Sequence, residues 1–414
     1  MRTVIRNIST LLGILPEGKL RLEGKEMGSV QEMHNAYLII EDGVITSFGQ
    51  EKDLPAAIPG EGEPSVIDAE SGMVMPSFCD SHTHLVYAGS REGEFLDKIK
   101  GLSYEQIASN GGGILNSSDL LHRTSEDELF RQSMKRVHEV LKKGTGALEI
   151  KSGYGLRTED ELKMLRVIRR IKNECPAIIK STFLGAHAVG RGYSMEDYVD
   201  LVCREMIPAV AKEGLADYID VFCDKGFFTP EDTERILEAG AAYGIPPKIH
   251  ANELDVSGGV QVGVRHGALS VDHLERTTDA EIEVLKGSGT MPTMLPGSSF
   301  FLGIPFGRGR DFIDAGLPLA LASDFNPGSS PSGDMRMVLA LACIRMKLTP
   351  AEAFNACTIN GAYAMGCADK AGSITPGKVA NLILTVPEIS LTGIPYLYAT
   401  PFISRTFLCG EEVS

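Results

Sequence analysis

The sequence lacks the features that mark several large classes of protein. No apolar run reaches the roughly 20 residues that a membrane-spanning helix needs, and residues 1–7 lack the apolar core of a signal peptide. Lys and Arg number 40 against 55 Asp and Glu, which gives a net charge of -15. Such a chain has no strong basic field to replace the counterions of nucleic acid. We therefore expect no membrane partner and no nucleic-acid partner.

A cysteine framework is also missing. The eight cysteines are scattered, no two of them form a C-x-x-C pair, and several lie in apolar runs. This arrangement favours buried free thiols in a reducing compartment over a set of disulfides. We therefore expect a cytoplasmic protein.

The two ends of the chain share a strand-rich character. Residues 37–49 read as a hairpin around the Asp42-Gly43 turn, and residues 377–384 and 403–410 read as strands. With 414 residues, the chain exceeds the usual size of one domain. We predict that both termini pair into one small β-sandwich domain, formed by residues 1–70 and 370–414.

The middle of the chain, residues 71–369, alternates short apolar runs with amphipathic helical stretches such as residues 125–143, which begin with a Ser125-x-x-Glu128 capping box. Strand and helix repeated eight times predict a (β/α)8 TIM-like barrel. An open doubly wound sheet is the alternative, but no Gly-rich phosphate loop follows the first strand. The eight candidate strands are residues 73–79, 147–151, 178–184, 218–222, 248–250, 269–273, 290–295 and 317–323.

Histidine is scarce, yet five of the nine histidines close a predicted strand. His82 and His84 end the first strand, and because side chains alternate along a strand they point the same way. His187 follows the third strand, His250 ends the fifth and His273 ends the sixth. In such barrels the chemistry lies at the carboxyl ends of the strands, so these imidazoles are expected to converge there.

A carboxylate completes this set, because Asp324 ends the eighth predicted strand. Three imidazoles and one carboxylate suit a single zinc-like ion with one position left for water, whose pKa the ion would lower. Asp324 is our candidate both for a ligand and for the base that takes the proton of this water. His273 is not needed as a ligand, and we place it beside the ion as an electrophile or proton carrier.

The order His-x-His, His, His, Asp over the strand ends resembles the amidohydrolase superfamily. Within it, six segments are similar to the imidazolonepropionase family of histidine degradation: Asp80-Ser81-His82-Thr83-His84-Leu85-Val86, Gly89-Ser90-Arg91, Gly111-Gly112-Gly113-Ile114, Lys151-Ser152-Gly153-Tyr154-Gly155-Leu156, Phe183-Leu184-Gly185-Ala186-His187 and Asp324-Phe325-Asn326-Pro327-Gly328-Ser329. The Lys-Ser-Gly-Tyr-Gly and Asp-Phe-Asn-Pro-Gly-Ser stretches are the specific ones. The six segments run from the first to the last predicted barrel strand, so the resemblance covers nearly the whole chain.

This resemblance implies a metal-dependent hydrolysis of the cyclic amide of 4-imidazolone-5-propanoate to N-formimidoyl-L-glutamate. It implies one zinc or iron ion on His82, His84, His250 and Asp324. It implies substrate contacts from Arg91, Tyr154, His187 and Ser329, with Glu253, Asn326 and Gly328 lining the same pocket. Catalysis would rest on Asp324, His273 and Glu253.

Some positions keep more than one interpretation. From the residues alone, Arg91 could form a salt bridge at the rim of the barrel, or its guanidinium could bind a substrate carboxylate through two hydrogen bonds. Tyr154 could pack its ring against the mouth of the barrel rather than contact the substrate, and His187 could cap the next segment rather than bind a ligand. Asn252 stands where the family commonly has an acidic residue. Lys151 ends the second predicted strand rather than the fourth, so we predict one metal and no carbamylated lysine.

Two other functions remain open. A different cyclic amidase or deaminase of the superfamily would share the metal site without needing Arg91. A non-catalytic barrel is the more distant alternative, although none of the expected ligands is missing from the sequence. We expect a homodimer, because closed two-fold assemblies are the commonest oligomers.

Overall fold

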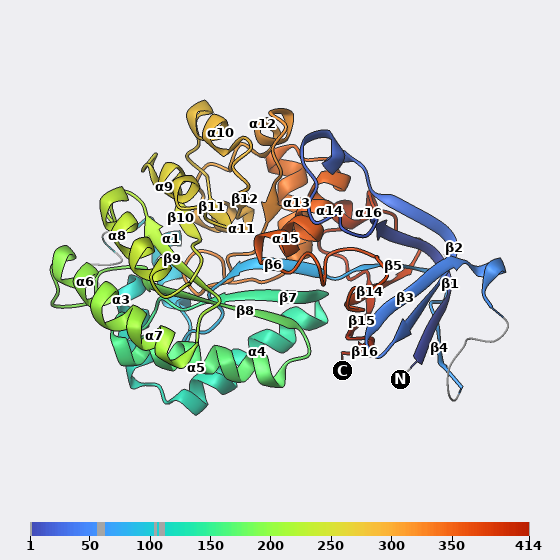
Figure 1. Cartoon of the computed structure of the whole chain (residues 1–414), viewed down its shortest axis with the longest axis horizontal. Coiled ribbons are helices and arrows are strands. Elements are labelled where there is room, and N and C mark those ends of the chain that lie inside the picture. Colours follow the sequence, from blue (N-terminus) through green and yellow to red (C-terminus); the bar gives the residue numbers. More distant parts are fainter. Residues whose placement is uncertain (1, 56–62, 103–105, 107–111, 414) are drawn as a thin grey trace.

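The computed structural model describes residues 2–55, 63–102, 106 and 112–413, and it contains two eight-stranded sheets that lie side by side (Figure 1). One sheet is parallel and forms a barrel. The other is mostly antiparallel and contains both ends of the chain, which Figure 1 marks N and C below and to the right of the centre of the view. The predicted fold class is confirmed. A search of the described helices found none with the length and apolar character needed to cross a membrane.

The barrel strands follow one another in chain order, and each pairs in parallel with the next. A parallel bridge between Thr83 and Phe325 joins the first strand to the segment that follows the last, which closes the barrel. The strands are β6 (Phe78–Thr83), β7 (Thr145–Lys151), β8 (Ile178–Ala186), β9 (Tyr218–Cys223), β10 (Ile249–Ala251), β11 (Ser270–His273), β12 (Met291–Met294) and β13 (Ala320–Leu321).

Helices cover the outside of the barrel (Figure 1). Sequence signals set their ends: Ser125 accepts a hydrogen bond from the Glu128 amide before α4, and Thr229 with Asp232 forms a reciprocal capping box before α8. The helices are α1 (Glu92–Ile99), α3 (Gly113–Arg123), α4 (Glu126–Lys142), α5 (Thr158–Glu174), α6 (Met195–Leu201), α7 (Ile207–Glu213), α8 (Pro230–Ala241), α9 (Gly259–Arg265), α10 (Asp279–Leu285), α11 (Pro296–Leu302), α12 (Gly309–Asp314), α13 (Met335–Met346), α14 (Pro350–Cys357), α15 (Ile359–Ala364) and α16 (Gly393–Tyr396).

The terminal sheet has the strand order β16-β15-β14-β5-β1-β2-β3, with β4 beside β1. Asp42 and Gly43 form the predicted hairpin turn with φ of 48° and 80°, the left-handed pair that a two-residue turn requires. The division of the chain at residues 70 and 370 stays a prediction. The strands are β1 (Arg2–Ile14), β2 (Gln31–Glu41), β3 (Val44–Gln50), β4 (Ser65–Asp68), β5 (Gly72–Pro76), β14 (Leu382–Pro387), β15 (Ile403–Leu408) and β16 (Glu411–Glu412).

The predicted first barrel strand, residues 73–79, is in fact two strands in two different sheets. β5 ends at Pro76 and pairs with β1 and β14, whereas β6 begins at Phe78 and pairs with β7. Between them, the Ser77 amide donates to the Asn381 carbonyl. A continuous apolar run does not reveal such a transfer, because both strands are buried along their whole length.

Candidate active site

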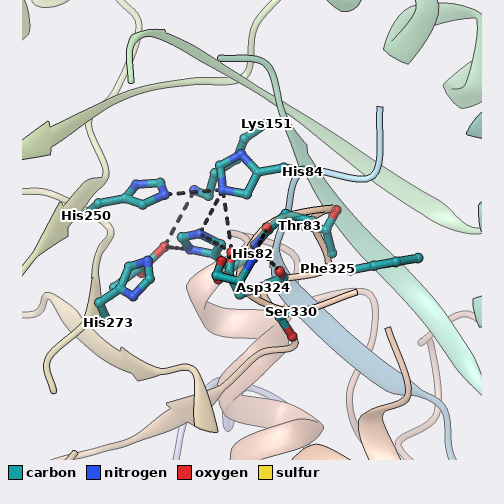
Figure 2. A network of polar contacts seen from close by, with 12 residues as sticks. His82, Thr83, His84, Lys151, His250, His273, Asp324, Phe325 and Ser330 are labelled. Carbon is teal, nitrogen blue, oxygen red and sulfur yellow. Dashed lines mark hydrogen bonds and ion pairs between the residues drawn. The ribbon is translucent and has the colours of Figure 1, made fainter. Parts of the chain in front are cut away.

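Three histidine side chains meet at the carboxyl ends of β6 and β10 (Figure 2). Nε2 of His84 lies 3.2 Å from Nε2 of His82 and 3.3 Å from Nε2 of His250. Oδ1 of Asp324 lies 3.6 Å from Nε2 of His82 and 3.7 Å from Nε2 of His84. All four side chains are buried. The barrel therefore brings the four predicted metal ligands together.

Buried carboxylates fix the orientation of two of these rings. Nδ1 of His82 lies 2.7 Å from Oδ2 of Asp272, and Nδ1 of His250 lies 2.9 Å from Oδ2 of Asp220. The Asp272 carboxylate accepts a hydrogen bond from Nδ1 of His82, so this Nδ1 carries the proton and Nε2 of His82 keeps its lone pair. Burial lowers the pKa of both imidazoles well below the usual range, which also favours the neutral ring.

These distances fit a bound metal ion. Imidazole nitrogens 3.2–3.3 Å apart either share a proton in a hydrogen bond or hold a cation between them. Zinc–nitrogen bonds of about 2.0–2.1 Å in tetrahedral geometry place two ligand atoms about 3.3–3.4 Å apart. Donor atoms of His82, His273 and Asp324 also lie within 4.8 Å of one another. The described residues therefore offer a His/Asp metal site, and its ligand set stays a prediction.

A layer of buried charge lies beneath the histidines. Nζ of Lys151 lies 2.7 Å from Oε1 of Glu149 and 2.8 Å from Oδ2 of Asp220. Lys248 donates to Glu149 and, at 3.2 Å, to the carbonyl of Ser81. Burial alone would lower the pKa of Lys151, but the surrounding carboxylates outweigh it and raise this pKa. Lys151 is thus an ion-paired support of the carboxylates that orient the metal-site histidines.

His273 stands beside the metal site between two acidic side chains. Its Nδ1 lies 3.5 Å from Oε2 of Glu275 and 3.7 Å from Oε2 of Glu253. Burial would lower its pKa, yet these two carboxylates raise it well above the usual value. Burial also raises the pKa of Glu253 to about 8, so this carboxyl group can carry a proton near neutral pH. Asp272, which precedes His273 in the sequence, pairs with His82.

The segment after β13 is held by its own side chains. The Asn326 amide group donates to the Asp324 carbonyl and to the Ser329 hydroxyl, both at 2.7 Å. Its oxygen accepts from the amides of Gly328 and Ser329, and the Ser329 hydroxyl donates to Oδ2 of Asp324 at 3.1 Å. Asn326 therefore shapes the loop that presents Asp324.

Arg91 faces the cavity from the start of α1 and is already paired. Its Nε and Nη2 donate to Oε2 of Glu94 at 2.8 and 2.6 Å. The guanidinium also lies against Gly328, where an added Cβ would come within 2.2 Å of Nη1. Gly328 thus leaves room for the arginine. Nearby, Lys98 donates to the Gly328 carbonyl at 3.2 Å and adds a second cation.

Tyr154 and His187 form the remaining part of the wall. The His187 ring stacks on His84 with centroids 5.2 Å apart, and the Tyr154 ring lies 5.4 Å from His187. Nδ1 of His187 donates to the Gly153 carbonyl at 2.9 Å, so its Nε2 is free of a proton. Burial lowers the pKa of His187 to about 4, which keeps the ring neutral. The hydrogen bond from His187 to a loop carbonyl agrees with the capping role that the sequence also allowed. The ring of His187 nevertheless lines the cavity.

One cavity of about 590 Å³ connects these groups. It is lined by His84, Arg91, Tyr154, His187, His250, Glu253, His273, Asp324, Asn326, Gly328 and Ser329, so of the predicted site residues only His82 is absent from its wall. Sequence reasoning missed the supporting acids Asp220 and Glu275. Asp220 had a usable signal, since it is a charged residue within an otherwise apolar strand, whereas Glu275 had none. Asn252, which stands where the family commonly has an acidic residue, accepts a hydrogen bond from the Ser257 amide and donates one to the Arg276 carbonyl. The acidic neighbour of His250 is Asp220.

Comparison with known proteins gives relatives of the same length. The chain is 52% identical to the imidazolonepropionase of Christiangramia forsetii and 51% identical to that of Flavobacterium johnsoniae, over 100% of each chain in both cases. It is 42% identical to the imidazolonepropionase of Brevibacillus brevis, over 99% of this chain and 97% of the relative.

Solved structures share the fold at low identity. A guanine deaminase from C. acetobutylicum superposes over 100% of both chains with a TM-score of 0.71 and 16% identity. A triazine hydrolase variant covers 99% of this chain and 94% of its own with a TM-score of 0.74 and 15% identity. Residues 73–404 match the model of the amidohydrolase family. Because this match spans most of the sequence and includes the whole barrel, the chain belongs to the amidohydrolase family.

Proposed function

We propose that this protein hydrolyses the cyclic amide of 4-imidazolone-5-propanoate and releases N-formimidoyl-L-glutamate in the degradation of L-histidine. The observation that carries the proposal is that one cavity holds both a His/Asp metal site and an arginine able to bind a carboxylate. The full-length relatives named above, at 51–52% identity, support the same activity.

We propose one zinc or iron ion, held by His82, His84, His250 and Asp324. When bound, such an ion polarises a carbonyl group and lowers the pKa of water. Imidazole and carboxylate donors suit both metals. Metal analysis of the purified protein tests this proposal, and two ions per subunit would contradict it.

The arm of the substrate binds at Arg91, in the same cavity as the metal site. Arg91 donates to the propionate carboxylate through Nη1 and reorients from Glu94 as the anion enters. Tyr154 and Ser329 add hydroxyl groups on either side of the ring. This binding aims the ring carbonyl at the metal site and fixes the distance of attack.

The side chains around the metal site move the protons. Asp324 takes a proton from the attacking water, and His273 donates to the oxygen that becomes negative as the carbonyl carbon turns tetrahedral. The bond between this carbon and the ring nitrogen then breaks. Glu253 or Asp324 delivers a proton to the nitrogen, whereas His187, whose Nε2 carries no proton, contacts the substrate as an acceptor. One water is consumed, and the ring opens to a carboxylate and a formimidoyl amine.

The test is the loss of imidazolone propionate with and without a chelator. We expect turnover that stops when the metal is removed and returns when zinc or iron is restored. A substrate without the carboxylate arm separates this proposal from another cyclic amidase or deaminase of the family. Equal turnover of the two substrates would overturn the assignment.

We further propose that the protein is a cytoplasmic homodimer. The eight cysteines are all unpaired, which fits a reducing compartment. Closed two-fold assembly is the commonest arrangement for enzymes of this size. Light scattering measures the mass in solution, and a monomer mass would refute the dimer.

A further inference from the structure

The loop between β7 and α5 folds around a buried carboxylate to which neither the metal site nor the proposed mechanism assigns a role. Glu161 lies in the first turns of α5 and is fully buried. Its Oε2 accepts from the Gly153 amide at 3.1 Å, and its Oε1 accepts from the amides of Gly155 and Leu156 at 2.7 and 3.0 Å. Three backbone amides within residues 153–156 are therefore tied to one side chain.

The backbone of this loop needs such support. Leu156 has a φ of 54° and Gly153 a φ of 113°, both outside the regions that ordinary residues favour. At Gly155 an added Cβ would come within 2.3 Å of the Glu161 amide nitrogen, so the loop lies directly on the helix. Without the carboxylate, three buried amides would lose their acceptors.

Two groups of the cavity depend on the loop. Tyr154 lies between two of the tethered amides, so their position fixes where its ring enters the wall. The carbonyl of Gly153 accepts the Nδ1 proton of His187, which leaves the Nε2 lone pair of that ring available to the cavity. The carboxylate thus holds both the loop that carries the tyrosine and the acceptor that selects the histidine tautomer.

We propose that Glu161 is a positioning residue for substrate binding: through the loop 153–156 it sets the placement of Tyr154 and the tautomer of His187. The inference rests on the proposed function, because both groups are assigned there to the substrate. Burial raises the pKa of Glu161 to about 7, and hydrogen bonds from Ser152 and the loop amides oppose this rise. Glu161 touches no metal ligand in the described structure, so its effect should spare the metal.

The experiment compares Glu161→Gln with Glu159→Gln. Glu159 lies on the same helix with its side chain 84% exposed, so its replacement makes the same change of charge at the surface. In Glu161→Gln the side chain keeps one acceptor oxygen, and its amide NH2 group takes the place of the other oxygen next to the loop. We expect a KM for imidazolone propionate raised roughly tenfold, with kcat changed much less and with unchanged metal content. Glu159→Gln should match the parent protein.

Two readouts need no substrate. In Glu161→Gln the amides of residues 153, 155 and 156 should exchange with deuterium at least about tenfold faster, and ¹⁵N shifts of the His187 ring should show a mixture of tautomers. A purely stabilising role would lower the melting temperature and the active fraction while KM and the tautomer stay unchanged, and that result would overturn the inference. If Glu161→Gln does not fold, Glu161→Asp, which retracts the carboxylate by one methylene, receives the same measurements.

The two proposals can fail separately. If the parent protein does not hydrolyse imidazolone propionate, the proposed function fails. If it does, and Glu161→Gln leaves KM, amide exchange and the His187 tautomer as they were, only the positioning role fails.

Discussion

Around the cavity, His82 and His250 are each paired with a buried carboxylate, whereas Arg91 is held by Glu94, its neighbour three residues along the chain. We call the first group the metal wall (His82, His84, His250, Asp324), of which all but His82 line the cavity, and the second the arm wall (Arg91, Glu94, Lys98). The metal wall joins β6, β10 and the end of the last barrel strand, and its supports come from β9 and β11. The arm wall lies on one short helix and its start.

The difference follows from what each wall must bind. A metal ion needs donor atoms fixed within tenths of an ångström, so its ligands are oriented by supports in the rigid barrel. The flexible carboxylate arm of the proposed substrate would tolerate a side chain that changes partner, and in that proposal Arg91 exchanges the carboxylate of Glu94 for that of the arm. Changes in the metal wall should therefore abolish function or folding, and changes in the arm wall should alter affinity.

The largest expected effect is at the metal wall. His250→Ala removes one of the three converging nitrogens, and we expect metal loss with a fall in kcat/KM on the order of a thousandfold or more. Metal analysis and the hydrolysis assay check this, with His138→Ala, an exposed histidine on α4, as the control. Normal metal content with normal turnover would remove His250 from the ligand set.

The next effect lies beneath that wall. Lys248→Met leaves the buried Glu149 without one of its two lysine partners, and breaking a buried pair costs roughly 3–5 kcal/mol of unfolding free energy. Denaturant unfolding measures it. Lys286→Met, a half-exposed lysine paired with Glu283, should stay within about 0.5 kcal/mol of the parent. Equal stability of both variants would show that the buried charges are dispensable.

At the arm wall the expected change is in affinity. Arg91→Ala removes a charge-assisted contact of about 2 kcal/mol, or roughly thirtyfold in KM. Metal content should not change, and Arg91→Lys should recover part of the loss because it keeps the charge without the fork. Steady-state kinetics check this. A large fall in metal content would erase the distinction between the two walls.

The smallest expected effect concerns Glu94. Its carboxylate occupies Nε and Nη2 of Arg91 and carries the same charge as the arm of the proposed substrate. Glu94→Gln should lower KM about twofold to threefold, since it weakens a competitor for the guanidinium. A KM raised as far as in Arg91→Ala would instead mean that Glu94 orients the arginine, which would make the arm wall as preorganised as the metal wall.

Sequence reasoning worked best where the signal is local. Seven of the barrel strands, the Asp42-Gly43 turn and the start of α4 follow from apolar runs, turn residues and a capping serine. It failed at residues 73–79, where an unbroken apolar run hides a change of sheet. It also named no acidic partner for Lys151, which the structure places among Glu149, Asp220 and Asp272.

By itself, the sequence determined which residues stand at the strand ends, because hydrophobic periodicity and the spacing of polar residues are properties of consecutive positions. Only the tertiary structure decided which partner each of them has: Asp272 for His82, Asp220 for His250 and Glu161 for the loop 153–156. The physical reason is that barrel closure brings together groups far apart along the chain, such as Asp80 and Ser323, which are 243 residues apart. Burial then requires each polar group there to find a partner, whatever its distance along the chain.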